Sequence, residues 1–232
     1  MWRTLLLFGV ACGRIGYDER PPDDGLTGVD GTDGPVDVPG ASACGMTVHL
    51  SDTFDDGVAA PNFLPNAMPG MTVSETGGDL VVQFAPTVAA GNYAYYRSAV
   101  AYPMDGFCVT VETVEAPANG GALYLKLRTA QLEVEMFGHS GVLETRTRQS
   151  NTVVTRDMFV LDLSVQRYWR LHQVGTSTFW ETSPDGVTYL QHTRLDGFFT
   201  ANMAQLELGA GAVTAVTNGG TARFASASAV GP

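Results

Sequence analysis

Short alternating segments dominate this sequence from residue 45 onward. Ten runs alternate apolar and polar residues, or nearly so, and turn residues such as Gly, Pro, Asp and Ser separate them. Alternation is typical of a strand with one face in the core, and no stretch keeps helical spacing over three turns. The runs are 46–50, 79–84, 107–114, 121–128, 131–137, 167–174, 176–183, 186–193, 204–211 and 221–230. They predict an all-β fold, a two-sheet antiparallel β-sandwich.

The first 43 residues follow a different pattern. Residues 1–12 read MWRTLLLFGVAC, a basic start and a short apolar run, with a small residue before cysteine. This resembles a bacterial lipoprotein signal and implies lipidation of Cys12; an ordinary secretory signal and a mis-assigned start codon are the alternatives. Residues 13–43 are rich in Gly, Pro and Asp and predict a flexible tether. We therefore expect a signal with the lipidation cysteine at 1–12, a tether at 13–43 and a sandwich domain at 44–232.

Export has consequences for the membrane and for the cysteines. No later segment approaches the roughly 18 apolar residues of a membrane helix, so the lipid on Cys12 is the only membrane contact we expect. This predicts a protein anchored in the cell envelope or on the outer surface. Cys44 and Cys108 are then an even pair in an oxidising compartment, which predicts a disulfide; two free buried thiols are the alternative.

The charge argues against nucleic acid as a partner. The formal net charge is −11, and no basic footprint is visible along the chain. The four histidines form no metal-binding spacing, and neither a G-x-S-x-G elbow nor a phosphate-binding loop is present. We expect no cofactor. The sequence does not indicate an oligomeric state.

One hairpin carries a recognisable pattern. Residues 168–175 read YWRLHQVG and residues 178–189 read TFWETSPDGVTY. They resemble the central hairpins of the concanavalin A-like lectin/glucanase superfamily, which includes laminin-G-like modules. LSDTFDD at 50–56 and ARFASASAV at 222–230 resemble its opening and closing strands. The resemblance spans about 45–232 and implies a jelly-roll sandwich; because its motifs are structural, it speaks for fold more than for function.

The same resemblance raises the question of catalysis. Several members of the superfamily are glycosidases that carry acids in a Glu-x-Asp-x-x-Glu pattern on one strand. The nearest segment here is LEVEMFG at 132–138, where Glu133 and Glu135 share a face but Gly138 stands in place of the third acid. A retaining mechanism needs two suitably placed carboxyl groups. We therefore expect no catalytic residues, and interpret the two glutamates as a solvated strand face.

The resemblance also implies possible ligands. Members often hold a structural calcium near the first and last strands, where Asp52 and Asp55 would be ligands and a turn-capping role is the alternative. Lectins stack sugars on exposed aromatics; our candidates are Tyr95 and Trp180, with Asn92 and Arg97 as hydrogen-bond partners. Packing in the core is the alternative for each aromatic.

We accordingly expect a non-catalytic, glycan-binding surface lipoprotein with a polysaccharide as its partner, and not an enzyme. A structural or protein-interaction sandwich without sugar binding is the first alternative. A divergent glycoside hydrolase is the second.

Overall fold

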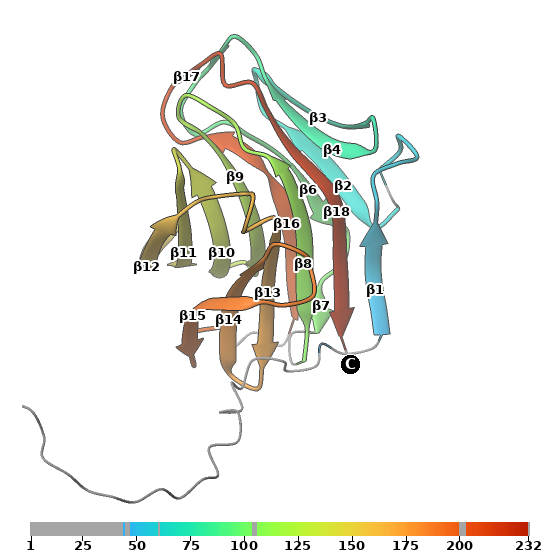
Figure 1. Cartoon of the computed structure of the whole chain (residues 1–232), viewed down its shortest axis with the longest axis vertical. Helices are drawn as coiled ribbons and strands as arrows, with labels where there is room; N and C mark the ends of the chain where they lie inside the picture. The colour runs from blue at the N-terminus through green and yellow to red at the C-terminus, as the bar shows by residue number, and fades with distance from the viewer. Residues whose placement is uncertain (1–43, 45–46, 60, 104–105, 200–202, 232) are drawn as a thin grey trace, which may run out of the picture. The chain divides into compact units, whose positions relative to one another are not determined.

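The computed structural model describes residue 44 and residues 47–59, 61–103, 106–199 and 203–231. The predicted signal, Cys12 and the tether at 13–43 lie outside these residues. All regular structure in the described ranges is β-strand, and every strand pairing is antiparallel (Figure 1). No described helix is long and apolar enough to span a membrane. The predicted all-β fold with two antiparallel sheets is therefore confirmed.

The first sheet has eight strands. They are β1 (Thr47–Asp52), β3 (Met71–Thr76), β4 (Asp79–Phe84), β8 (Cys108–Glu115), β13 (Tyr168–Val174), β14 (Ser177–Ser183), β15 (Leu190–Asp196) and β18 (Thr221–Gly231). Their order is β15-β14-β13-β8-β18-β4-β3, and β1 also pairs with β18.

The second sheet also has eight strands. They are β2 (Phe63–Ala67), β6 (Tyr93–Ser98), β7 (Tyr102–Pro103), β9 (Gly121–Arg128), β10 (Leu132–His139), β11 (Val142–Gln149), β12 (Thr152–Val160) and β16 (Met203–Ala212). Their order is β12-β11-β10-β9-β16-β6-β2, with β7 on β16. Two short strands, β5 (Thr87–Val88) and β17 (Val216–Thr217), form a separate pair.

The core lies between the two sheets. Alternation sends one side chain of each pair inward, and one cluster of buried apolar residues draws on both sheets. Leu171 of β13 and Leu125 of β9 are both fully buried in it. Trp180 of β14 also reaches across, because its indole N–H donates to the carbonyl of Glu135 on β10 at 3.0 Å. The opposite faces of both sheets point away from this core.

The hairpin singled out in the sequence forms as predicted. Strands β13 and β14 pair in register from Tyr168↔Ser183 to Val174↔Ser177. Gly175 takes a positive φ of 57° in the turn between them. After β14, Asp185 Oδ1 accepts hydrogen bonds from the backbone N–H groups of Val187 and Thr188, at 2.9 and 3.0 Å. This capped turn is longer than expected, so the next strand begins at Leu190 rather than at residue 186.

The predicted disulfide is confirmed. Cys44 and Cys108 are bonded, 64 residues apart in sequence. Cys108 opens β8, while Cys44 precedes β1, and β18 pairs with both of these strands. The bond therefore joins the chain ahead of the first strand to the middle of the first sheet.

Candidate active site

The outward face of the second sheet holds a cleft of about 240 Å³. It is lined by Met68, Tyr93, Tyr95, Arg97, Tyr124, Lys126, Arg128, Glu133, Glu135, Phe137, Arg146, Arg148, Asn151 and Glu207. Most of these side chains come from β6, β9, β10, β11 and β16, which are neighbours in the sheet. Alternation along each strand explains the set, because residues two apart share a face.

Strand register aligns charges of alternating sign across this face. Glu207 on β16 is paired with Arg97 on one side and with Lys126 on the other. Lys126 is in turn paired with Glu135 on β10, and Glu135 with Arg146 on β11. We call these five residues the charged row. Directly opposite residues of opposite charge stabilise neighbouring strands, so the row fits the sheet that carries it.

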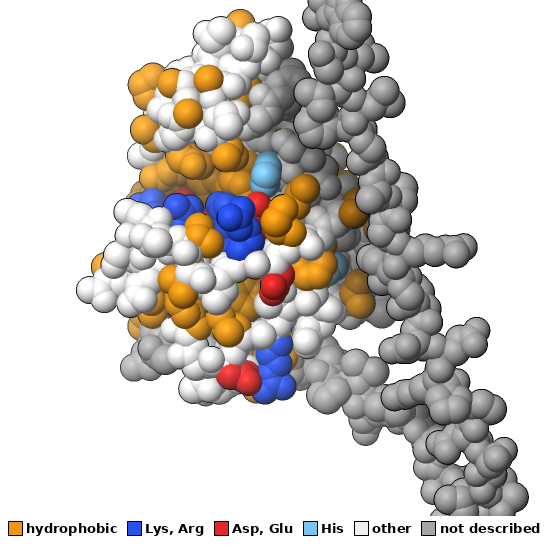
Figure 2. Space-filling view, turned by 90° about the vertical axis from the view of Figure 1, so that its left-hand side faces the viewer, with side chains coloured by type: hydrophobic (Ala, Val, Ile, Leu, Met, Phe, Trp, Pro, Cys, Tyr) orange, Lys and Arg blue, Asp and Glu red, His pale blue; other side chains and the backbone are white. Residues whose placement is uncertain are grey.

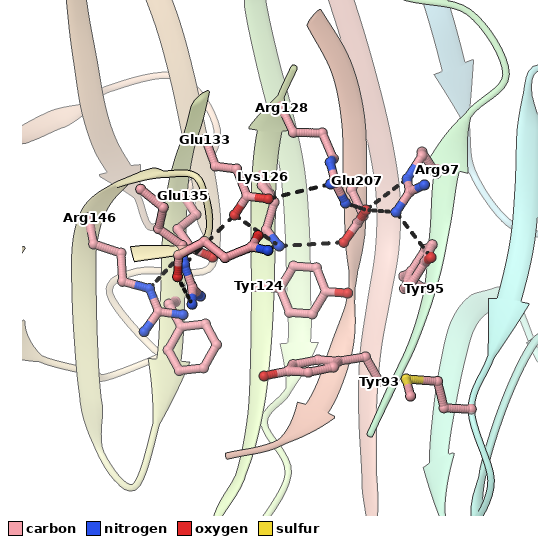
Figure 3. A pocket seen from close by; sticks show the side chains of 14 residues that line it. Tyr93, Tyr95, Arg97, Tyr124, Lys126, Arg128, Glu133, Glu135, Arg146 and Glu207 are labelled. Atoms are coloured by element: carbon pink, nitrogen blue, oxygen red, sulfur yellow. Dashed lines mark hydrogen bonds and ion pairs between the residues drawn. The ribbon is translucent and has the colours of Figure 1, made fainter. Parts of the chain in front are cut away.

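Three carboxylates surround one ammonium group at the floor of the cleft. Lys126 Nζ lies 3.7 Å from Glu133, 3.9 Å from Glu135 and 3.5 Å from Glu207 (Figure 3). Glu133 and Glu207 therefore contact the same ammonium group, and their carboxylates lie close to each other. Both carboxylates also approach Arg128, at 3.6 and 3.2 Å.

The three carboxylates differ in how firmly they are held. Glu207 accepts two hydrogen bonds from Arg97, at 2.8 and 2.6 Å, and Glu135 accepts one from Arg146 at 2.6 Å. Glu133 has ion-pair contacts of 3.6 Å or longer, and accepts no side-chain hydrogen bond from the described residues. Its side chain is 8% exposed, against 1% for Glu135 and 3% for Glu207. Glu133 is thus the least restrained of the three.

The cations around Glu207 fix its ionisation. Burial alone would raise its pKa, but Lys126, Arg97 and Arg128 outweigh burial and hold the pKa below its ordinary value. Glu207 is therefore an ionised carboxylate at neutral pH. A carboxylate of this kind suits a nucleophile or a stabiliser of positive charge better than a proton donor.

An aromatic cluster adjoins the charged row. Tyr124 of β9 and Phe137 of β10 are buried side by side, with half-buried Tyr93 and Tyr95 packed against them. The Tyr93 ring lies against Gly211 of β16, where a Cβ would collide with it, and a Cβ at Gly209 would collide with the Ala94 carbonyl and with Cα and Cβ of Tyr95. The two glycines thus leave room for Tyr93 and Tyr95 beside the cleft.

Two of the four predicted glycan-binding residues line the cleft, and the other two do not. Tyr95 and Arg97 both line the cleft, where Arg97 donates a hydrogen bond of 3.0 Å to the Tyr95 hydroxyl. Asn92 does not line it; its amide donates to the Pro69 carbonyl at 2.8 Å. Trp180 is 1% exposed in the core between the sheets, so its proposed stacking role is wrong. Glycan contact by Tyr95, Asn92 and Arg97 stays a prediction.

The residues predicted to bind calcium lie at the end of β1 and on the turn that follows it. Asp52 Oδ1 accepts a hydrogen bond from the Phe54 backbone N–H at 2.8 Å, which is a turn-capping role. Asp55 is exposed on the following turn. In the part of the chain that the structure describes, no group of three or more His, Cys, Asp or Glu side chains is arranged to hold a metal. Calcium ligation by Asp52 and Asp55 stays a prediction.

Comparison with known proteins gives structural matches only. No protein-family model matches the chain, and no curated protein matches it in sequence. It is similar to the endo-β-1,3-glucanase of Pyrococcus furiosus, with a TM-score of 0.60 and 7% identity over 79% of this chain and 94% of that one. The β-glucanase of Bacillus licheniformis gives 0.59 and 10%, over 80% and 99%. The laminarinase catalytic domain of Thermotoga petrophila gives 0.58 and 10%, over 79% and 96%.

These similarities contradict two predictions made from the sequence. The similar solved structures are endo-glucanases, which speaks against the expected non-catalytic glycan-binding role and against the expectation that the protein is not an enzyme. Catalysis had not been expected because Gly138 stands in place of a third acid on the strand of Glu133 and Glu135. The fold supplies a third carboxylate from another strand, since Glu207 of β16 joins them around Lys126.

Identities of 7 to 11% show the fold and not the activity. The similarity covers 78 to 80% of this chain, so it includes most of the two-sheet antiparallel sandwich. The domain therefore has a sandwich fold similar to that of these glucanases, as the resemblance to the concanavalin A-like superfamily implied.

Proposed function

We propose that the protein is a glycoside hydrolase that cleaves a polysaccharide in the cleft of the second sheet. The observation that carries the proposal is the gathering of Glu133, Glu135 and Glu207 at the floor of an open cleft. Glycoside hydrolysis needs two carboxyl groups beside one glycosidic bond: one acts as proton donor and the other as nucleophile or base. The similar structures, which are glucanases, support the same reaction class.

We assign the proton transfer to Glu133 and the ionised role to Glu207. Glu133 is the most exposed of the three carboxylates, and no hydrogen bond from the described residues fixes it. Glu207 is held ionised by Lys126, Arg97 and Arg128. The two share Lys126 and Arg128 as neighbours and so face the same space (Figure 3). Glu135, hydrogen-bonded to Arg146, is a positioning residue that helps to hold Lys126.

The polysaccharide has a natural place beside these groups. Tyr95 and Tyr93 flank the carboxylates with half-buried rings, and aromatic faces of this kind are suited to pack against sugar rings. Arg97 and Arg128 add N–H donors for hydroxyl or acidic oxygens of the chain. This arrangement keeps the earlier expectation that the partner is a polysaccharide, and adds a reaction to it.

The direct experiment measures release of reducing ends by the full chain. The substrates are laminarin and lichenan, chosen because the similar structures include a laminarinase and a lichenase, together with a panel of acidic polysaccharides. Glu133→Gln and Glu207→Gln should each lower kcat by about 10²- to 10⁴-fold, as expected for loss of a proton-transfer or nucleophilic group. Glu115→Gln, an exposed glutamate of β8, is the matched control and should keep full activity. If none of these substrates releases reducing ends, the proposal is overturned.

We also infer that the enzyme acts outside the cytoplasm as a lipid-anchored protein. The lipoprotein-like start before Cys12 supports this, and so does the Cys44–Cys108 disulfide, because such bonds persist in oxidising compartments. Labelling with a radioactive fatty acid should mark the wild-type protein and fail to mark Cys12→Ser. Equal labelling of the two, or none of either, would rule out the anchor at this cysteine.

A further inference from the structure

We propose that the cleft takes an anionic polysaccharide, one that carries uronate or sulfate groups along its chain. This inference rests on the proposed function, because it names the substrate class of the same cleft. It starts from an uneven distribution of charge over a protein whose formal net charge is −11.

Basic residues collect on the outward face of the second sheet. Ten of the 13 basic residues and 17 of the acidic residues follow residue 45. Six of these ten basic residues lie on this face, but only four of the 17 acidic residues do. The basic six are Arg97, Lys126, Arg128, Arg146, Arg148 and Arg156, and the acidic four are Glu133, Glu135, Glu144 and Glu207. The rest of the domain is strongly acidic, so the cleft is a local positive region in a negative molecule.

The charges of the cleft are arranged in two layers. The carboxylates lie at the floor, with side chains 1–8% exposed. The guanidinium groups of Arg97, Arg128 and Arg148 lie nearer to solvent, with side chains 27–28% exposed. Figure 2 shows a group of Lys and Arg side chains on one face of the molecule, with hydrophobic side chains around it and separate Asp or Glu side chains below it. A ligand entering the cleft therefore meets cations first.

Many of the N–H donors of these arginines remain for a ligand. Arg128 makes one hydrogen bond with the described residues, to Glu207 at 3.2 Å, although a guanidinium carries five N–H donors. Arg148 donates to the Asn151 carbonyl at 2.9 Å, and its Nε is buried without a hydrogen-bond partner among the described residues. A neutral sugar would offer these cations only uncharged hydroxyl and ring oxygens in place of water. A carboxylate or sulfate group would replace it with charge-assisted hydrogen bonds.

The same surface favours a glycan over nucleic acid. The tyrosines beside the cations are half-buried and held by packing on Tyr124 and Phe137, so they form a fixed wall. Nucleic acid binding depends on neutralising many phosphates with an extended basic surface. Here the positive region is confined to a single cleft, so it could neutralise only a few phosphates of a nucleic acid at once.

The test measures binding and cleavage by the full chain separately. Binding is followed by affinity electrophoresis and titration calorimetry, with polygalacturonate as the uronate probe and κ-carrageenan as the sulfate probe. Laminarin is the neutral control and single-stranded DNA the polyanion control. We expect at least one acidic glycan to bind more tightly than laminarin by tenfold or more, and to weaken from low to physiological salt. Tighter binding of laminarin, or equally tight binding of DNA, overturns the inference.

Two variants locate the effect. Arg128→Gln with Arg148→Gln removes two solvent-facing cations of the cleft, and should weaken binding of the acidic glycan by tenfold or more, a larger loss than the one it causes in laminarin binding. Arg194→Gln, on β15 of the first sheet and paired with Asp196, is the matched control and should change neither. If the double variant does not fold, the salt dependence of the wild-type protein still decides between the two outcomes.

The two proposals fail in distinguishable ways. Binding of an acidic glycan without cleavage of any polysaccharide would uphold the ligand class and overturn the hydrolase. Cleavage of laminarin with no preference for acidic glycans would uphold the hydrolase and overturn the ligand class. Preferential cleavage of polygalacturonate or κ-carrageenan supports both, and identifies which acidic group the arginines recognise.

Discussion

Two groups of buried glutamates in this molecule have similar partners and different surroundings. On the outward face of the first sheet, Glu181 accepts a hydrogen bond from Arg170 at 2.6 Å and lies 2.9 Å from His172 Nδ1. The Tyr189 ring covers Arg170, and His172 is stacked on Phe179. This closed cluster, which we define as Arg170, His172 and Glu181, is sealed by its neighbours.

The cleft of the second sheet has the same kinds of group and opens to solvent. Its carboxylates are as deeply buried as Glu181, but a surplus of arginines lies above them with side chains partly exposed. In both places, cations hold a glutamate pKa below its ordinary value against the effect of burial. Paired charges alone therefore do not mark a site. A site is marked by access to solvent together with cations whose N–H donors are not all used within the protein.

Glu181→Gln gives the largest expected effect on stability and tests whether the closed cluster is structural. The change leaves Arg170 without its carboxylate in a buried position, and should lower the free energy of unfolding by about 3–5 kcal/mol. Urea denaturation measures the loss. Activity per folded molecule should stay at the wild-type level, and a loss of kcat in the folded variant would break the distinction between the two regions.

Removal of the disulfide tests whether the two regions unfold together. Cys44→Ser with Cys108→Ser opens a loop of 64 residues, which should lower the free energy of unfolding by about 4 kcal/mol in the loop-entropy model. The bond lies on the first sheet, so polysaccharide binding in the cleft should persist in the folded fraction. Separate urea transitions for tryptophan fluorescence and far-ultraviolet circular dichroism would show that the two sheets do not unfold as one unit.

A third carboxylate cluster, formed by Glu75, Asp52 and Asp56, provides the opposite case, because no cation of the described residues lowers the pKa of Glu75. Burial raises the pKa of Glu75 to about 7, and the carboxylates of Asp52 and Asp56 add to the effect. Between pH 4.5 and about 7 the folded protein keeps a proton on Glu75 that the unfolded chain has released, so stability falls as pH rises through this range. Below pH 4.5 the retained proton on Glu75 carries no cost to the free energy of unfolding. Above about pH 7 the free energy of unfolding has fallen by the full amount, about 3 kcal/mol.

Glu75→Gln should remove this dependence. Its free energy of unfolding should exceed that of wild type by about 3 kcal/mol at pH 8 and match it near pH 4. Urea denaturation at the two pH values, with EDTA present because Asp52 is a predicted calcium ligand, makes the comparison. A constant difference between the two proteins at both pH values would show that Glu75 does not retain its proton in the fold.

Tyr95→Phe has the smallest expected effect and refines the description of the cleft. The change removes only the hydroxyl that accepts a hydrogen bond from Arg97 at 3.0 Å, so stability should fall by about 1 kcal/mol. The ring remains for contact with a sugar. Thermal unfolding measures the change, and a loss above about 3 kcal/mol would mean that Tyr95 is part of the core rather than of the cleft wall.

Alternation predicted strands whose inward-facing residues are apolar, and it missed β11, where some of these residues are polar. Strand β11 reads VLETRTRQ, with Thr145 and Thr147 as inward residues. Their hydroxyls bond to Thr193 and Thr155, at 2.6 and 2.7 Å, so the inward face there is polar and the usual signal is absent. In β6 alternation puts half-buried Tyr93 and Tyr95 on one face and buried Tyr96 on the other.

The candidate site was predicted only as far as one strand allows. Glu133 and Glu135 are two residues apart, so alternation alone placed them on one face. Glu207 is more than 70 residues away and reaches them across β9, so its place depends on sheet register, which the sequence does not reveal. The basic cluster was missed for the same reason, because its six residues come from four strands of the sheet.

Trp180 was misplaced although a signal was present. Alternation along the strand sets Trp180 on the face opposite Phe179 and Glu181, and Leu171 is a typical core residue. A tight turn at Gly175 pairs Leu171 with Trp180, so both side chains share a face. The hairpin register would therefore have assigned Trp180 to the interior.

The charged row also determines how the strands align. A slip of β10 by one residue along β9 would turn Glu133 and Glu135 toward the apolar interior. A slip by two residues that set Phe137 opposite Lys126 in place of Glu135 would keep their faces but break the alternation of charge. The side chains that would receive a substrate thus also reject misaligned sheets during folding, and a variant that neutralises the row risks a mispaired sheet as well as a weaker enzyme.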